Sequence, residues 1–123
     1  MVGVRFILQF PFSLRQRRLT ASRRPMSRDE FIEAVSSTED GRNAATMLWN
    51  KLNEFRAWDG FTPYPSDDLG RVYGMAEEEL DEDTVLDILE KTNTPIPSPE
   101  FLEKFGPLKT PQDIIRLVEL CNG

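Results

Sequence analysis

"SPEFLEKFGPLKTPQDIIRLVEL", residues 98–120, contains the start and stop residues of two consecutive helices. Ser98 followed by Pro99 is an N-cap with proline at the first helical position. Gly106 ends this short helix, and "TPQD" at 110–113 opens the next one in a similar way. The second helix carries an apolar face made of Ile114, Ile115, Leu117, Val118 and Cys121. Two amphipathic helices are therefore expected, over 99–105 and from about 111 onward.

Four further helices are expected upstream, and only Val4–Phe10 has an alternation resembling a strand. The first spans 28–35 and starts with a capping box of Ser27 and Glu30, and the second, 42–58, is the longest. The third spans 67–73, with Ser66 as its cap and Gly74 at its end. The fourth spans 81–91 and is capped by Asp81 or Asp83. The fold class is therefore an all-α bundle of about four main helices with extra short ones. Its expected core is Phe31, Leu48, Leu52, Phe55, Leu69, Leu86, Leu89, Phe101, Ile115 and Val118.

Charge is distributed unevenly along the 123 residues. Residues 1–25 contain six arginines and no acid, whereas all 21 acids and the other nine bases follow, giving that part a formal net charge of −12. An acidic surface repels nucleic acid and anionic lipid and favours partners with a basic docking patch. We therefore expect no nucleic-acid partner and no membrane association, and we expect a monomer.

The first 26 residues are expected to form a disordered basic extension, with the folded domain spanning 27–123. "SRDEF" after Met26 opens a helix, so an upstream start codon is one explanation of the extension. The segment is rich in arginine and free of acids, so a transit peptide and a nucleic-acid-binding arm are the alternatives.

The chain has no histidine and one cysteine. Histidine is the commonest general base at neutral pH and the commonest metal ligand, so its absence argues against an enzyme and against a metal site. A single cysteine, Cys121, allows no internal disulfide and is typical of a reducing compartment. We expect a cytoplasmic protein without enzymatic activity, and a buried thiol in the last helix.

"EEELDEDT", residues 77–84, is the most acidic segment. Acids are favoured at a helix start by the free N–H groups and the helix dipole. A calcium loop that began at Glu79 would need glycine at its sixth position, where Thr84 stands, so no metal is expected. Paired carboxylates for acid–base catalysis would need a pocket and perturbed pKa values. The acids are therefore interpreted as a solvated helix start or a docking surface.

The order of these elements resembles that of acyl carrier proteins, over roughly Phe31–Cys121. The resemblance lies in "DDLG" at 67–70, in "LDEDTVLDIL" at 80–89, which is similar to the recognition helix, and in the two helices of 98–120. In that family, a serine in an Asp-Ser-Leu motif at the start of the recognition helix carries phosphopantetheine. The matching position here is Glu79 or Asp81, and neither has a hydroxyl. The resemblance therefore implies the carrier fold without the prosthetic group.

Two functions remain open at this point. The first is a non-enzymatic protein-interaction module without a cofactor. Its candidate partner-binding residues are Asp81, Glu82, Asp83, Asp87 and Glu90. The alternative is a genuine acyl or peptidyl carrier that bears phosphopantetheine on an atypical hydroxyl, such as that of Ser66 or Thr84.

Overall fold

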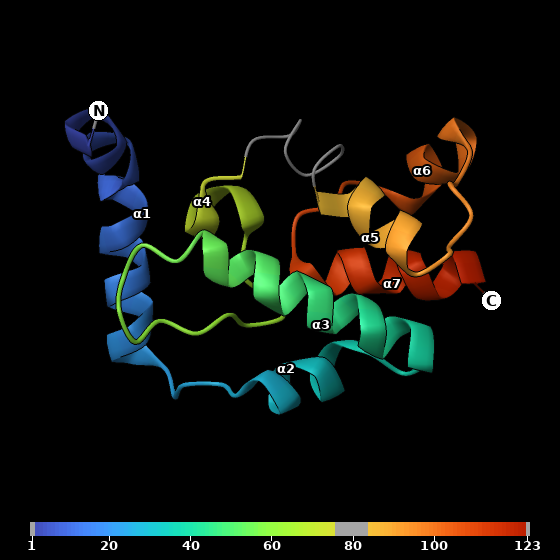
Figure 1. Ribbon diagram of the computed structural model, residues 1–123, viewed down its shortest axis with the longest axis horizontal. Helices are drawn as coiled ribbons and strands as arrows, with labels where there is room; N and C mark the ends of the chain where they lie inside the picture. The colour runs from blue at the N-terminus through green and yellow to red at the C-terminus, as the bar shows by residue number, and fades with distance from the viewer. Residues whose placement is uncertain (1, 76–83, 123) are drawn as a thin grey trace.

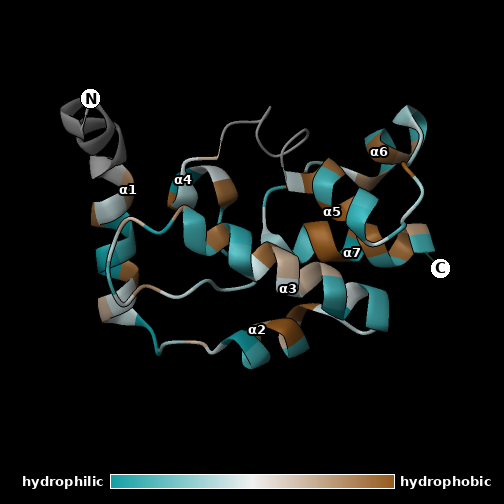
Figure 2. Ribbon diagram, in the orientation of Figure 1, coloured by the Kyte–Doolittle hydropathy of each residue, from teal (hydrophilic) through white to brown (hydrophobic). Residues whose placement is uncertain are grey.

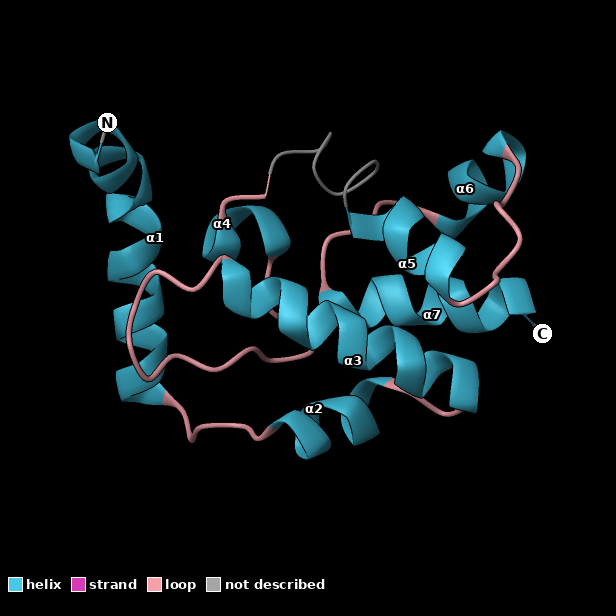
Figure 3. Cartoon of the chain, in the orientation of Figure 1, coloured by secondary structure: helices cyan, strands magenta, loops and turns pink. Residues whose placement is uncertain are grey.

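The computed structural model describes residues 2–75 and 84–122, with only the backbone described up to Pro11. These ranges contain seven helices and no strand (Figure 3), which confirms the expected all-α bundle. The helices are α1 (Val2–Ser22), α2 (Arg28–Val35), α3 (Glu39–Glu54), α4 (Leu69–Tyr73), α5 (Leu86–Lys91), α6 (Pro99–Phe105) and α7 (Pro111–Asn122). No helix in these ranges combines the length and the hydrophobicity needed to cross a bilayer.

The caps explain most helix boundaries. Ser27 and Glu30 form the predicted capping box of α2, and Ser98 caps α6 as predicted by accepting from the Phe101 N–H. The predicted cap at Ser66 is wrong, because Asp68 caps α4 by accepting from the Arg71 N–H at 2.8 Å. Gly74 ends α4 in the left-handed conformation (φ 71°), which glycine adopts without a Cβ clash.

The predicted range 42–58 is shifted relative to α3, and α1 rather than α3 is the longest helix. The helix starts earlier because the Thr38 side chain accepts from the Gly41 N–H at 3.0 Å. It ends earlier because the Oε1 atom of Gln16 accepts the N–H groups of Ala57 and Trp58, at 2.8 and 3.2 Å. A helix that reached the predicted end at Trp58 would need those two N–H groups for its own ladder, whereas the N–H groups of Phe55 and Arg56 bond to carbonyls only three residues back.

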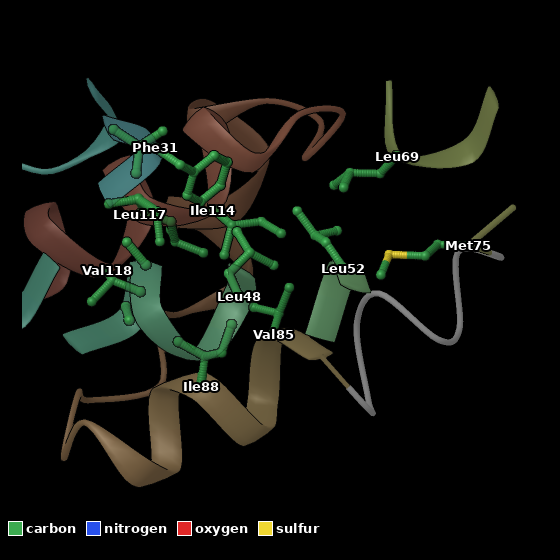
Figure 4. Close-up of a cluster of buried hydrophobic side chains, with 14 of the residues drawn as sticks. Phe31, Leu48, Leu52, Leu69, Met75, Val85, Ile88, Ile114, Leu117 and Val118 are labelled. Carbon is green, nitrogen blue, oxygen red and sulfur yellow. The ribbon is translucent and has the colours of Figure 1, made fainter. Parts of the chain in front are cut away.

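The core lies between α2, α3, α5 and α7, whose side chains point toward one another in Figure 4. Seven of the ten predicted core residues are buried, and Phe55 is partly buried. The predictions for Leu86 and Phe101 are wrong, because their side chains are 40% and 37% exposed. No residue of α6 is buried, and Phe101 stacks on Phe105 of the same helix, with ring centroids 6.4 Å apart. The short helix α6 therefore does not contribute a buried side chain to the core.

The first 26 residues differ from the expected disordered extension, because Val2–Ser22 form α1 at one end of the molecule (Figure 1). Phe12, Gln16, Leu19 and Arg23 recur every three or four residues, so they share one face of α1. Phe12 lies against Gly74, where a Cβ would come within 2.7 Å of its ring. Gln16 is fully buried and Leu19 packs against the core. The folded unit therefore extends upstream of Ser27.

Candidate functional site

The predicted acidic docking residues are only partly described. Asp81, Glu82, Asp83 and the attachment position at Glu79 or Asp81 lie outside the described residues, as does the predicted helix start. Among the described residues, α5 begins at Leu86, preceded by one wider turn at Thr84 and Val85, and it ends at Lys91 as expected. Glu90 is exposed, and the half-exposed carboxylate of Asp87 is 3.2 Å from the Lys91 Nζ. One of the two described acids is therefore already paired with a base.

An apolar groove that the sequence did not predict lies beside α5, on the side away from Asp87. It encloses about 230 Å³ between α5, the following loop, α6 and α7. Figure 2 shows hydrophobic residues on these three helices, at the end of the molecule opposite α1. The groove is lined by Val85, Leu86, Leu89, Ile96, Pro97, Leu102, Leu108 and Leu117.

Three of the groove residues are notably exposed: Leu86 at 40%, Ile96 at 74% and Leu102 at 38%. The loop that carries Ile96 is held in place, because the Thr94 N–H donates to the Leu89 carbonyl at 2.8 Å. The Asn122 side chain of α7 also donates to the Thr94 Oγ1 at 2.7 Å. Pro95 and Pro97 fix φ on either side of Ile96. The exposed apolar surface is therefore built on a constrained loop, and such patches mark interaction sites.

A polar groove of about 400 Å³ lies on the α3 side of α5. Its charged residues form ion pairs within their own helices, Lys51 with Glu54 at 3.4 Å on α3 and Lys91 with Asp87 on α5. Thr84 also lines this groove, but its Oγ1 is buried and has no hydrogen-bond partner among the described residues. Since the four charges cancel, this groove selects neither an anion nor a cation.

The described residues contain no group of three or more metal-ligating side chains. Of the two hydroxyls considered for phosphopantetheine, Thr84 is only 2% exposed, whereas Ser66 is exposed in the loop before α4. Cys121 is partly buried rather than fully buried, and this burial raises the pKa of its thiol. A raised pKa lowers the thiolate fraction and hence the reactivity of the cysteine.

A buried polar cluster at the α1 end was also not predicted from the sequence. Arg23 binds Asp67 through both guanidinium nitrogens, at 2.6 and 3.0 Å, and its guanidinium lies 3.9 Å from the ring centroid of Tyr64. The Tyr73 hydroxyl donates to Asp67 at 2.7 Å. Burial raises the pKa of Tyr73 far above its usual value, and the Asp67 charge raises it further. All these groups are paired, so we interpret the cluster as a structural anchor for α1.

The sequence contained no local indication of this cluster, because Arg23 and Asp67 are 44 positions apart. The groove likewise unites residues from separate segments, three helices and two loops. One indication was available for the groove: Ile96 stands between prolines in "TPIPSP", where no helix can bury it.

No protein-family model matches the chain, and comparisons with curated proteins and with solved structures found no match either.

Proposed function

We propose that the chain is a non-enzymatic protein-interaction module that binds a basic partner through the apolar groove and the acidic helix beside it. The observation that carries this proposal is the exposure of Leu86, Ile96 and Leu102 around one groove. Burying apolar surface contributes roughly 25 cal/mol per Å². A partner that covers these side chains therefore gains affinity from them.

The charge around the groove selects the partner. Residues 77–106 contain ten acids and two bases. Among the described residues of this stretch, two acids, Asp87 and Glu90, lie on α5, and two more, Glu100 and Glu103, lie on α6. Glu90 lies four residues after Leu86, hence on the same side of α5 as the groove. A helical segment with apolar residues flanked by lysine or arginine has the complementary chemistry.

The carrier-like order of helices supports a module of this kind, since the proposed fold keeps an acidic recognition helix while Glu79 and Asp81 replace the attachment serine. Docking then does not need a prosthetic group. Incubation with a phosphopantetheinyl transferase and coenzyme A should leave the mass unchanged. A gain of one phosphopantetheine group mapped to Ser66 or Thr84 would support the alternative, a carrier modified at an atypical hydroxyl.

The direct test uses a fluorescent amphipathic helical peptide of leucine and lysine, with a leucine–glutamate peptide as its counterpart. We expect the basic peptide to bind, with an affinity that falls as salt rises, and the acidic one not to bind. Leu102→Glu should reduce affinity at least tenfold, because it places a charge in the groove. Leu120→Glu is the matched control, since Leu120 is 52% exposed on α7 outside the groove. If the wild type, Leu102→Glu and Leu120→Glu bind the basic peptide with equal affinity, the proposal is contradicted.

A further inference from the structure

The outward side of α1 carries a second surface with the opposite charge. Its inward face is packed through Gln16 and Arg23, whereas Leu14, Arg15 and Arg18 are exposed. Leu14 and Arg18 are four residues apart, so they lie side by side on the helix. With Leu19 and Arg15 they line a hollow of about 330 Å³. The segment around them, residues 1–25, has six arginines and no acid.

This basic, leucine-bearing surface has the chemistry that the groove requires. The two surfaces lie at opposite ends of the molecule, α1 at one end and α5 with α6 at the other (Figure 1). Gln16 and the Arg23–Asp67 pair fix α1 to the loop after α3 and to α4. The α1 of one molecule therefore cannot occupy the groove of the same molecule without breaking these bonds.

We infer that a second copy of this chain docks the outward side of its α1 in the groove, in a head-to-tail arrangement. This inference rests on the proposed function and names one partner for it. Leu14 enters the groove, and Arg15 and Arg18 face the exposed acids of α5 and α6, which are Glu90, Glu100 and Glu103. Because the two contacting surfaces are different, a dimer keeps one free groove, on the molecule that docked its α1, and one free α1, on the other molecule. The assembly therefore grows with concentration or closes into a ring, unlike the monomer expected from the sequence.

The test compares two complementary variants in analytical ultracentrifugation. Arg15→Glu/Arg18→Glu removes the basic surface and keeps the groove, whereas Leu102→Glu blocks the groove and keeps α1. Arg17 is left unchanged because it lies over the Trp58 ring, at 5.2 Å. Arg28→Glu/Arg42→Glu, at two exposed arginines, is the control for the same change in net charge.

The wild type and the charge control should increase in mass with concentration, and the effect should weaken in salt. Each complementary variant alone should stay monomeric with an unchanged circular dichroism spectrum. Their equimolar mixture should form dimers and nothing larger, since only one docking contact remains possible. A wild type that stays monomeric at every concentration, or a mixture that forms no dimer, overturns the inference. If the basic peptide still binds the groove in that case, the proposed function stands and only self-docking fails.

Discussion

The two ends of the molecule differ in how far their side chains are buried and paired within the chain. At the α1 end, Gln16 and Asp67 are buried, and both join α1 to distant parts of the chain, Gln16 through Phe55, Val72 and Ala57 and Asp67 through Arg23. At the α5–α6 end, large apolar side chains remain exposed around a groove, and the loop that borders it is tied to α5 and α7 by hydrogen bonds. The inward face of α1 is fully bonded within one chain, whereas the groove leaves apolar surface that a partner can bury. We therefore expect mutations of the buried polar residues at the α1 end to affect folding, and mutations of the exposed groove residues to affect binding.

The largest stability loss is expected for Asp67→Ala. This change leaves Arg23 without its carboxylate and removes the acceptor of the Tyr73 hydroxyl and the Tyr64 N–H. Breaking a buried pair by removing one partner costs about 3–5 kcal/mol, and we expect about 3 because Arg23 is 18% exposed. Urea unfolding measures the loss. Asp68→Ala is the neighbouring control, which removes only the α4 cap and should cost about 1 kcal/mol. Equal losses for the two variants would contradict a role of Asp67 as an anchor.

Gln16→Leu comes next, with an expected loss of about 2–3 kcal/mol. The Gln16 side chain donates to the carbonyls of Phe55 and Val72 and accepts from two backbone N–H groups. Leucine leaves these four backbone groups without their partner, and one unsatisfied buried group costs about 1–3 kcal/mol. Water can reach the partly buried groups of Phe55, Ala57 and Trp58 and offset part of this cost. Urea unfolding gives the free energy, with Arg15→Leu, an exposed neighbour on α1, as control. A Gln16→Leu protein as stable as the control would mean that α1 is not anchored by this residue.

Glu119→Gln should have a smaller effect, and one that depends on pH. Burial alone raises the pKa of Glu119, but bonds from the N–H groups of Ser37 and Thr38 and from both hydroxyls outweigh it, so the pKa lies below 4.5. A lowered pKa means that the ionised carboxylate stabilises the fold above pH 4.5 and that this contribution is lost as pH falls through the folded-state value.

By accepting from the Ser37 and Thr38 N–H groups just before α3, Glu119 should contribute about 1 kcal/mol at pH 7. The wild type and the Glu119→Gln protein should then become equally stable at acid pH, in urea unfolding at a series of pH values. Glu33→Gln, at an exposed acid on α2, serves as control. A difference between wild type and variant that does not change with pH would contradict this role.

The smallest stability effect is expected at the groove. Ile96→Ser should change the free energy of unfolding by less than about 0.5 kcal/mol, because the side chain is 74% exposed. Binding of the leucine–lysine peptide should nevertheless weaken several-fold, since the same side chain becomes buried in the complex. A loss of stability larger than 1 kcal/mol, with unchanged binding, would mean that Ile96 serves the fold alone.

Local chemistry made most of the helices predictable from the sequence. The capping box at Ser27, the proline start at Pro99 and the glycine ends at Gly74 and Gly106 act within a few residues, so each could be read directly. The end of α3 could not, because it depends on Gln16, 41 positions upstream of Ala57. Leu86 was assigned to the core because its spacing does not distinguish a side chain that faces the core from one that faces a groove.

The proposed function requires that a partner covers the groove, and methyl NMR tests this requirement directly. The leucine–lysine peptide is titrated into protein labelled at leucine and isoleucine methyls. The groove methyls of Leu86, Leu89, Ile96, Leu102 and Leu117 are expected to shift, whereas those of Leu48 and Leu69, buried elsewhere in the core, should stay in place. Shifts confined to residues outside the groove, or none at a peptide concentration that saturates binding, would contradict the account.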